Sequence, residues 1–402
     1  MKSTKVFIIV LILLIIIAGG LFALKILGDM KNSEIANTSA DANLINSENN
    51  QEPTTPKTLS GAERPIAVMI DNHIDAMPQA GLLEADIVYE MIVEGGETRL
   101  MLILQDKDLE KIGPVRSARH YFLDYALEND AIYVHFGWSP QAESDIASLG
   151  INNINGIYES EISFWRVNDK YAPHNAVTST ESITKIVQRE GYRRTTSAEP
   201  VLNYVVDEVN LENGQDANTV VIPYSYVNTV RYEYDEELKE YVRYSRDEKQ
   251  VDWDTEKPVT TKNIIIEKVK NSMLNDGTEK GRQTLDNIGE HEGYYITNGK
   301  AIEIKCIKNS RSAQTVYEDL EGNEINVNDG KTFIQICPID SEIEIEGKED
   351  NTVGTIEANV TEQTSNFIYE IRFKILTLKI LSKRVKGIEL WKKITKIQIK
   401  NL

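Results

Sequence analysis

The chain has 402 residues, of which 41% are hydrophobic, so it is long enough to bury sizeable cores, and this argues against disorder throughout. Its formal net charge is −19, and because residues 1–31 carry +3 and residues 367–402 carry +8, the part between them carries −30. Such an acidic body argues against nucleic acid as a partner, since neutralising phosphates requires a basic face.

An uninterrupted apolar segment of 19 residues runs from Val6 to Leu24. At about 1.5 Å per residue, a helix of this length nearly spans the hydrocarbon core of a bilayer. The alternative is a cleaved secretory signal, which usually has an apolar region of only about 7 to 15 residues followed by a small-residue processing site. We therefore expect residues 1–31 to form a single-pass anchor in the cell membrane, with the bulk of the chain on the extracytoplasmic side. A cleaved signal would also export the rest of the chain.

The next segments predict a linker and then a first domain. Residues 32–62 are rich in Asn, Ser, Thr, Glu and Pro with little periodic apolarity, which is typical of a flexible tether. We expect the first domain over residues 63–214, as an α/β layered domain in which strands and helices alternate. Its predicted strands are 64–71, 98–106 and 131–137, and its predicted helices are 115–130, 139–150 and 179–191.

A mostly β domain is predicted over residues 215–345, where apolar and polar residues alternate and Asn-Gly and Asp-Gly pairs signal turns. Residues 230–244 are predicted to form a hairpin within this domain. The fold class expected for the whole chain is thus α/β, or α+β overall. Cys306 and Cys337 both lie in β-like runs, and they can form a disulfide or remain as buried free thiols.

The last segment, residues 346–402, is predicted to be a polar linker followed by a basic amphipathic tail. From residue 367 onward, apolar and cationic residues alternate. One interpretation is adhesion to anionic lipid headgroups or wall polymers. The alternatives are an extra edge strand or a tail without a role, because basic amphipathic patterns are weak evidence on their own.

Several segments of the first domain carry many polar residues, namely RPIAVMIDNH, MPQAGLLEADIVYE, EGGETRLMLI, IGPVRSARHY and YAPHNAV. In this order and spacing they resemble the amino-terminal domain of the YerB-like family of bacterial envelope lipoproteins. NGKAIEIKCIK and GNEINVNDGKTFIQICP are similar to that family's carboxyl-terminal domain, so the resemblance covers residues 63–345. It implies an envelope location, here on a Gram-positive-type bacterium, and leaves any reaction open. A lipoprotein needs a cysteine directly after its signal, and no cysteine precedes Cys306, so we expect a transmembrane anchor in place of the lipid.

The IGPVRSAR segment predicts an anion site. Arg116 and Arg119 are three residues apart and would share a face at the start of the predicted helix, where free amides and the helix dipole favour an oxyanion. The alternative is that these arginines pair internally with Glu90, Glu94 or Asp71. The predicted ligand-binding residues are Asp71, Asn72, Arg99, Arg116, Ser117, Arg119, Arg166 and Asn175.

Catalysis is the second hypothesis for this domain. Glu90 and Glu94 are four residues apart and would share a face of a helix or a strand, as general acid and base work could use, with His135 or His174 nearby. No HExxH or other tight ligand spacing predicts a metal, and no motif predicts a cofactor. We expect a non-catalytic envelope protein that binds an anionic or sugar-containing wall component or a partner protein. The alternative is a hydrolase or lyase acting on the cell wall.

Overall fold

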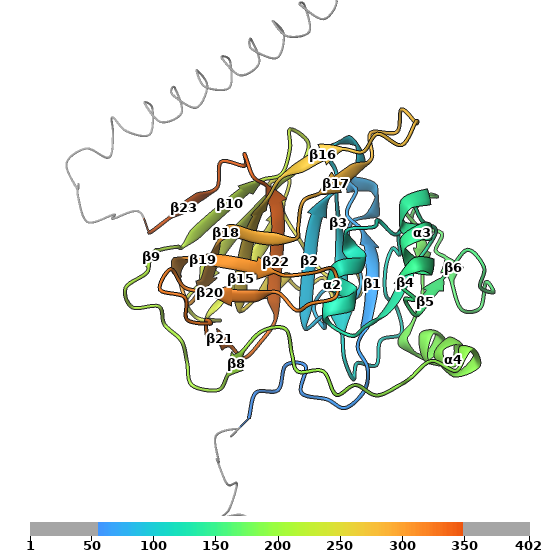
Figure 1. Ribbon diagram of the computed structural model, residues 1–402, viewed down its shortest axis with the longest axis horizontal. Coiled ribbons are helices and arrows are strands. Elements are labelled where there is room, and N and C mark those ends of the chain that lie inside the picture. The colour runs from blue at the N-terminus through green and yellow to red at the C-terminus, as the bar shows by residue number, and fades with distance from the viewer. Residues whose placement is uncertain (1–54, 349–402) are drawn as a thin grey trace, which may run out of the picture. The chain divides into compact units, whose positions relative to one another are not determined.

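The computed structural model describes residues 55–348, and strands dominate this part of the chain (Figure 1). The α/β class expected from the sequence is therefore wrong, since too few helices form to cover the faces of a sheet. The helical elements within the described range are α2 (Phe122–Glu128), α3 (Pro140–Ser148) and α4 (Thr180–Glu190), with the short 3₁₀ turns η1 (Ile74–Ala76) and η2 (Glu94–Gly96).

One large mixed sheet organises the described chain. Its order is β20-β19-β18-β15-β22-β2-β3-β1-β4-β5, with β9 paired to β19 (Figure 1). Its strands are β1 (Ile66–Asp71), β2 (Ile87–Ile92), β3 (Thr98–Leu104), β4 (Ile132–His135), β5 (Asn153–Asn155), β9 (Gln215–Asp216), β15 (Asn263–Val269), β18 (Gly289–Thr297), β19 (Lys300–Lys308), β20 (Val316–Glu318) and β22 (Thr332–Pro338). Because β2 pairs in parallel with β22, strands from both halves of the sequence share this sheet. The division at residue 214 stays a prediction.

A second sheet contains the predicted hairpin at 230–244, which is confirmed as β11 and β12. Its order is β13-β12-β11-β10-β23, with β14 paired to β12. Its strands are β10 (Thr219–Pro223), β11 (Thr229–Asp235), β12 (Glu240–Ser245), β13 (Glu248–Lys249), β14 (Thr260–Thr261) and β23 (Glu344–Glu346). The remaining short strands are β6 (Trp165–Arg166), β7 (Ala176–Val177), β8 (Tyr204–Val205), β16 (Asn271–Met273), β17 (Gln283–Leu285) and β21 (Val327–Asn328).

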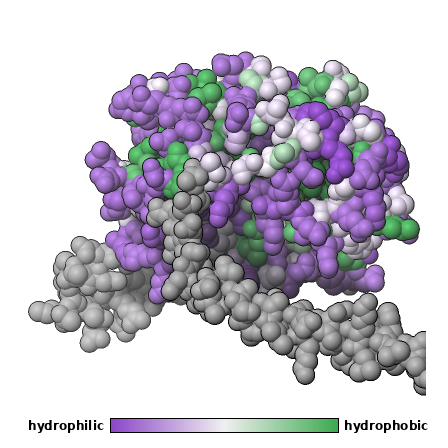
Figure 2. Space-filling model, turned by 90° about the horizontal axis from the view of Figure 1, so that it is seen from below, coloured by the Kyte–Doolittle hydropathy of each residue, from purple (hydrophilic) through white to green (hydrophobic). Residues whose placement is uncertain are grey.

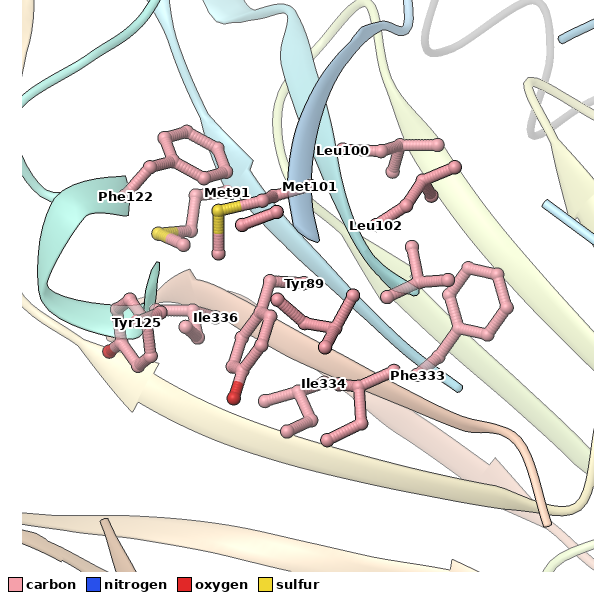
Figure 3. Close-up of a cluster of buried hydrophobic side chains, with 14 of the residues drawn as sticks. Tyr89, Met91, Leu100, Met101, Leu102, Phe122, Tyr125, Phe333, Ile334 and Ile336 are labelled. Atoms are coloured by element: carbon pink, nitrogen blue, oxygen red, sulfur yellow. The ribbon is translucent and has the colours of Figure 1, made fainter. Parts of the chain in front are cut away.

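Alternation along the central strands gives the large sheet two buried faces, because successive side chains of a strand point to opposite sides. On one face, Tyr89 and Met91 lie beside Phe122 and Tyr125 of α2 (Figure 3). The other face is covered by the second sheet, where the ring of Tyr232 meets that of Phe333 edge-on at 5.9 Å between centroids. Burial on both faces explains why β1, β2, β3 and β22 read as nearly continuous apolar runs.

Two of the three predicted helices of the first domain form with the end signals that the sequence contains. Ser139 caps α3 by accepting a hydrogen bond from the amide of Ala142, and Ser179 caps α4. Gly191 ends α4 in the left-handed conformation, with φ of 67°, which glycine adopts without strain.

The predicted helix at 115–130 is wrong over its first half, because α2 begins only at Phe122. Val115 and Ala118 form isolated β-bridges instead, residues 120–121 form a turn, and amides of this segment bond to other strands and loops. The amide of Arg116 donates to the carbonyl of Met69 at 2.9 Å, and that of Ala118 donates to the carbonyl of Gly137 at 2.9 Å. Tertiary partners thus take up the groups that a helix would have bonded locally.

Other predictions have mixed outcomes. No helix within residues 55–348 is long and apolar enough to cross a membrane, and the segments expected as anchor (1–31) and basic tail (367–402) lie outside the described residues. Cys306 and Cys337 are both buried free thiols, so that alternative is confirmed. The face drawn in Figure 2 is mostly hydrophilic, with apolar residues scattered singly or in small groups, as on most protein surfaces in contact with water.

Candidate functional site

A pocket of about 470 Å³ lies where several central strands of the large sheet end. Strands β1, β2 and β4 all run toward this end of the sheet, since β1 is parallel to β4 and both β1 and β2 are antiparallel to β3. Carboxyl ends of parallel strands are where α/β sheets usually bind ligands, and the same geometry holds here. The pocket is lined by Asp71, His73, Glu94, Glu97, Arg99, Arg116, Ser117, Arg119, Trp138, Ser139, His174, Lys280 and Arg282.

The lining of this pocket is cationic although the chain is acidic. Five lining side chains are Arg or Lys and three are Asp or Glu, which leaves a formal excess of two positive charges before either histidine is protonated. The whole chain carries −19. A positive pocket in an acidic protein focuses anions from solution, because the local potential opposes that of the surrounding surface.

Arg119 makes a two-pronged ion pair with Glu94. Its Nε donates to Oε1 at 2.7 Å and its Nη2 donates to Oε2 at 2.9 Å, a geometry that fixes both side chains. Burial alone would raise the pKa of Glu94, but the hydrogen bonds and charge of Arg119, together with Arg99, outweigh burial and lower that pKa. Glu94 is therefore a carboxylate that holds the arginine cluster in place.

Asp71 holds a second group of side chains at the end of β1. Its Oδ2 lies 3.0 Å from Nε of Arg116 and 2.7 Å from Nδ1 of His174. The amide of His73 donates to Oδ1 at 3.2 Å. The Nε of Arg116 is ion-paired by distance but does not form a well-aligned hydrogen bond, so this arginine is held less tightly than Arg119.

Arg99 lines the pocket and is almost fully buried, with 6% of its surface exposed. Its guanidinium donates to the carbonyl of Ser117, and its nearest carboxylate oxygen, on Glu94, lies 3.9 Å away. Burial first, and then the like charge of Arg119, lower the pKa of Arg99 to about 9. The positive charge of this guanidinium is therefore poorly compensated, and an anion bound in the pocket would stabilise its charged form.

The hairpin of β16 and β17 supplies two cations that the sequence analysis missed. Lys280 and Arg282 follow the turn at Asp276 and Gly277, and Arg282 pairs with Asp276 and lies 3.9 Å from Glu94. The only signal was the basic EKGR stretch after an Asp-Gly turn, and nothing local in it shows which sheet edge the hairpin reaches. His73 and Ser139 were missed as lining residues as well.

The structure brings together Asp71, Arg99, Arg116, Ser117, Arg119, Glu94 and His174 of the predicted site residues. Arg116 and Arg119 meet there from a segment outside α2, so the predicted shared helix face is wrong even though both line the pocket. Both also pair with carboxylates, as the alternative interpretation expected.

The other predicted residues lie away from the pocket. Glu90 and His135 are fully buried, and the His135 ring bonds to the carbonyl of Gly137 at 2.8 Å and the side chain of Asn153 at 3.1 Å. Burial lowers the pKa of His135.

Glu90 faces the second sheet, where it pairs with Arg243 at 2.7 Å and accepts hydrogen bonds from Asn72 and Thr98. Arg166 donates a hydrogen bond to the side chain of Asn175 at 2.6 Å, which links two nearby parts of the chain. Glu90 and Glu94 therefore lie in different environments. They share no cleft in which they could act together as general acid and general base.

The polar groups of the pocket suit binding more than bond breaking. The hydroxyl of Ser117 donates to the carbonyl of Phe136 at 3.0 Å, and that of Ser139 caps α3. His174 and Asp71 have the spacing of a base and its orienting carboxylate, but both pocket hydroxyls are committed elsewhere. Among the described residues, His73, Asp75 and His174 place donor atoms close enough together to hold a metal ion.

Comparisons with known proteins agree with the sequence resemblance. Residues 52–193 match the N-terminal domain, and residues 220–334 the C-terminal domain, of the family described as "Protein of unknown function (DUF3048)". The chain is 32% identical over 283 residues to the "Putative lipoprotein YerB" of Bacillus subtilis (strain 168), covering 68% of this chain and 81% of that one. It also matches the crystal structure of the YerB protein from Bacillus subtilis with a TM-score of 0.63 and 33% identity, over 70% of this chain and 94% of the other.

Proposed function

The chain belongs to the YerB-like family with DUF3048 N- and C-terminal domains, and from that membership we propose that it is a membrane-associated extracytoplasmic protein whose pocket binds an anionic component of the cell envelope. The relative's name as a lipoprotein supports the location. The cationic lining of the pocket is the observation that carries the ligand class.

The arginines support an anion as ligand because their charge is only partly compensated inside the protein. Arg119, Arg99 and Arg282 all lie near Glu94, and Arg282 also pairs with Asp276, so two carboxylates serve three guanidinium groups. Guanidinium groups bind phosphate and carboxylate through paired N–H donors, which suits the acidic groups of envelope polymers.

An aromatic wall supports a ligand that also carries sugar. Trp138 lines the pocket, and Tyr158 packs edge-on against it at 5.9 Å between ring centroids. Tyr158 is 72% exposed, so this pair of rings has a solvent-accessible face. Such rings offer an apolar face for packing beside a polar edge, as a sugar ring requires.

The test is a binding titration of the full-length protein with poly(glycerol phosphate), with neutral dextran as the uncharged comparison. The double variant Lys280→Gln with Arg282→Gln should bind the polyanion about tenfold more weakly, since two charge contacts of about 0.5 to 1 kcal/mol each are lost. Lys185→Gln with Arg189→Gln removes the same charge from α4, outside the pocket, and should bind like the parent protein.

Added salt should weaken the binding, because the contacts are largely electrostatic. Equal weakening by the two double variants would show that only net charge matters, and equal binding of dextran would remove the case for an anion. For the location, the protein should sediment with membranes and be cut by external protease on intact cells.

A further inference from the structure

We propose that His73, Asp75 and His174 form a binding site for a divalent transition metal such as Zn²⁺ at the rim of the pocket. One ring nitrogen of each histidine and one carboxylate oxygen of Asp75 lie within 4.8 Å of one another. The two imidazole rings are stacked, with 4.5 Å between centroids and 18° between planes. Residues from the turn after β1 and from the loop before β7 thus converge on one point.

His174 is oriented as a ligand histidine would be. Its Nδ1 lies 2.7 Å from Oδ2 of Asp71, a distance at which the ring donates its proton to the carboxylate. The other nitrogen, Nε2, is then left with its lone pair. Metal-binding histidines almost always have such a carboxylate or carbonyl partner, which fixes the tautomer and the direction of the ring.

His73 also presents a nitrogen without a proton. The amide of Asp75 donates to its Nδ1 at 3.2 Å, so in the neutral ring this nitrogen is an acceptor. Because the nitrogen has a single lone pair, a cation bound there would replace this long amide hydrogen bond. Oδ2 of Asp75, another acceptor, lies 3.5 Å from the same Nδ1. Two ligands on a tetrahedral zinc with bonds of about 2.0 to 2.1 Å are separated by about 3.3 Å, so these two atoms already have nearly the spacing that a shared cation requires.

The donor set decides the class of metal. Two imidazoles and one carboxylate suit zinc and its neighbours in the first transition series better than magnesium or calcium, which prefer oxygen ligands. Three protein ligands with a further position open to water is also the arrangement of zinc sites that are not purely structural. The side chains of His73 and Asp75 are 34% and 70% exposed, so a metal has an open entry path.

This inference does not depend on the anion proposed for the pocket, because the metal site is complete without it. His73 and His174 both line the pocket, so a bound cation would add positive charge to its wall. Metal binding and anion binding can therefore be tested with separate probes and separate variants.

The experiment is a calorimetric titration of the chelator-treated, full-length protein with Zn²⁺ alone. One site should be seen, and Asp75→Asn and His73→Ala should each weaken it at least tenfold. Asp75 is largely exposed, so its substitution should leave the circular dichroism spectrum and the melting temperature unchanged. Asp71→Asn, which removes the carboxylate that orients His174, should weaken zinc binding about 10- to 100-fold.

Two controls separate this site from other causes. Glu181→Gln removes an exposed carboxylate from α4 and should bind zinc like the parent. Lys280→Gln should retain zinc binding while weakening polyanion binding, which distinguishes failure of this site from failure of the proposed function. The inference is overturned if no zinc binds, or if Asp75→Asn and His73→Ala both bind zinc as tightly as the parent protein.

Discussion

Two groups of arginine–carboxylate pairs in this protein have similar chemistry and opposite surroundings. Arg243 and Glu90 are sealed between the two sheets, with no exposed side-chain surface. Arg116 and Arg119, paired with Asp71 and Glu94, open onto the pocket. The comparison teaches that pairing alone does not separate a structural arginine from a binding one, whereas exposure and the local balance of charge do.

The sealed pair is balanced as well as buried. Oε1 of Glu90 accepts hydrogen bonds from Asn72 and Thr98, while Oε2 pairs with Arg243. The guanidinium of Arg243 lies over the ring of Phe333, 5.1 Å from its centroid. The further hydrogen bonds of the pair are with the neutral side chains of Asn72, Thr98 and Tyr232, so its two charges match one to one. In the pocket, by contrast, arginines outnumber the carboxylates that serve them.

The largest effect should come from breaking the sealed pair. Arg243→Met leaves Glu90 as an uncompensated buried charge and should lower the free energy of unfolding by about 3 to 5 kcal/mol, measured by urea denaturation. Adding Glu90→Gln removes that charge and should restore part of the loss. A loss below about 1 kcal/mol for the single variant would show that the pair is not the structural element described here.

A second sealed carboxylate should give the protein a pH-dependent stability. Burial raises the pKa of Glu267, and the hydrogen bond from His291 Nδ1 to Glu267 at 2.9 Å raises the pKa of His291 above 6.5. Because the folded state holds protons more tightly at both groups, the stability that they contribute is present at low pH and lost as pH rises through these raised values.

The contribution of Glu267 to the melting temperature should therefore begin to fall above pH 4.5, and that of His291 above pH 6.5. The His291→Gln and Glu267→Gln variants should show flatter profiles than the parent protein. Parallel profiles for parent and variants would contradict this assignment.

A pocket arginine should affect binding more than stability. Arg119→Gln loses the two-pronged contact with Glu94, but Glu94 keeps partial exposure and its approach to Arg99 and Arg282. We expect a loss of stability of about 1 kcal/mol and a loss of polyanion affinity of about tenfold. Urea denaturation and titration of the same preparation measure both quantities. A stability loss as large as that of Arg243→Met would place Arg119 among the structural arginines.

The sequence predicted those features whose signals are local. The Ser caps and the terminal Gly191 define α3 and α4, and the alternation at 230–244 defines a hairpin. Local signals failed at 115–121, because the amides of that segment bond to Met69 and Gly137, which are distant in sequence. The mostly β class was missed because short helical patterns next to strands do not show that a second sheet covers the large one.

For the site, sequence reasoning found the residues that follow strands β1 and β2 but not the partners that come from elsewhere. The polar clusters at Asp71 and Glu94 were visible, since they interrupt apolar runs. Lys280 and Arg282 reach the pocket through a hairpin some 200 residues from Asp71, and no local pattern encodes that meeting. Glu90 was considered as a catalytic residue, but it is a buried structural residue, because it pairs with Arg243, a partner that the sequence did not indicate.

The most direct test of the central claim is Arg116→Ala, measured for stability and for polyanion binding in the same preparation. The side chain of Arg116 is 24% exposed, and Asp71 keeps its contacts with His174 and the amide of His73 after the change. We expect a loss of unfolding free energy below about 1 kcal/mol and at least a tenfold loss of affinity per folded molecule. A loss of about 3 to 5 kcal/mol with binding per folded molecule intact would contradict it, because Arg116 would then be a structural partner of Asp71.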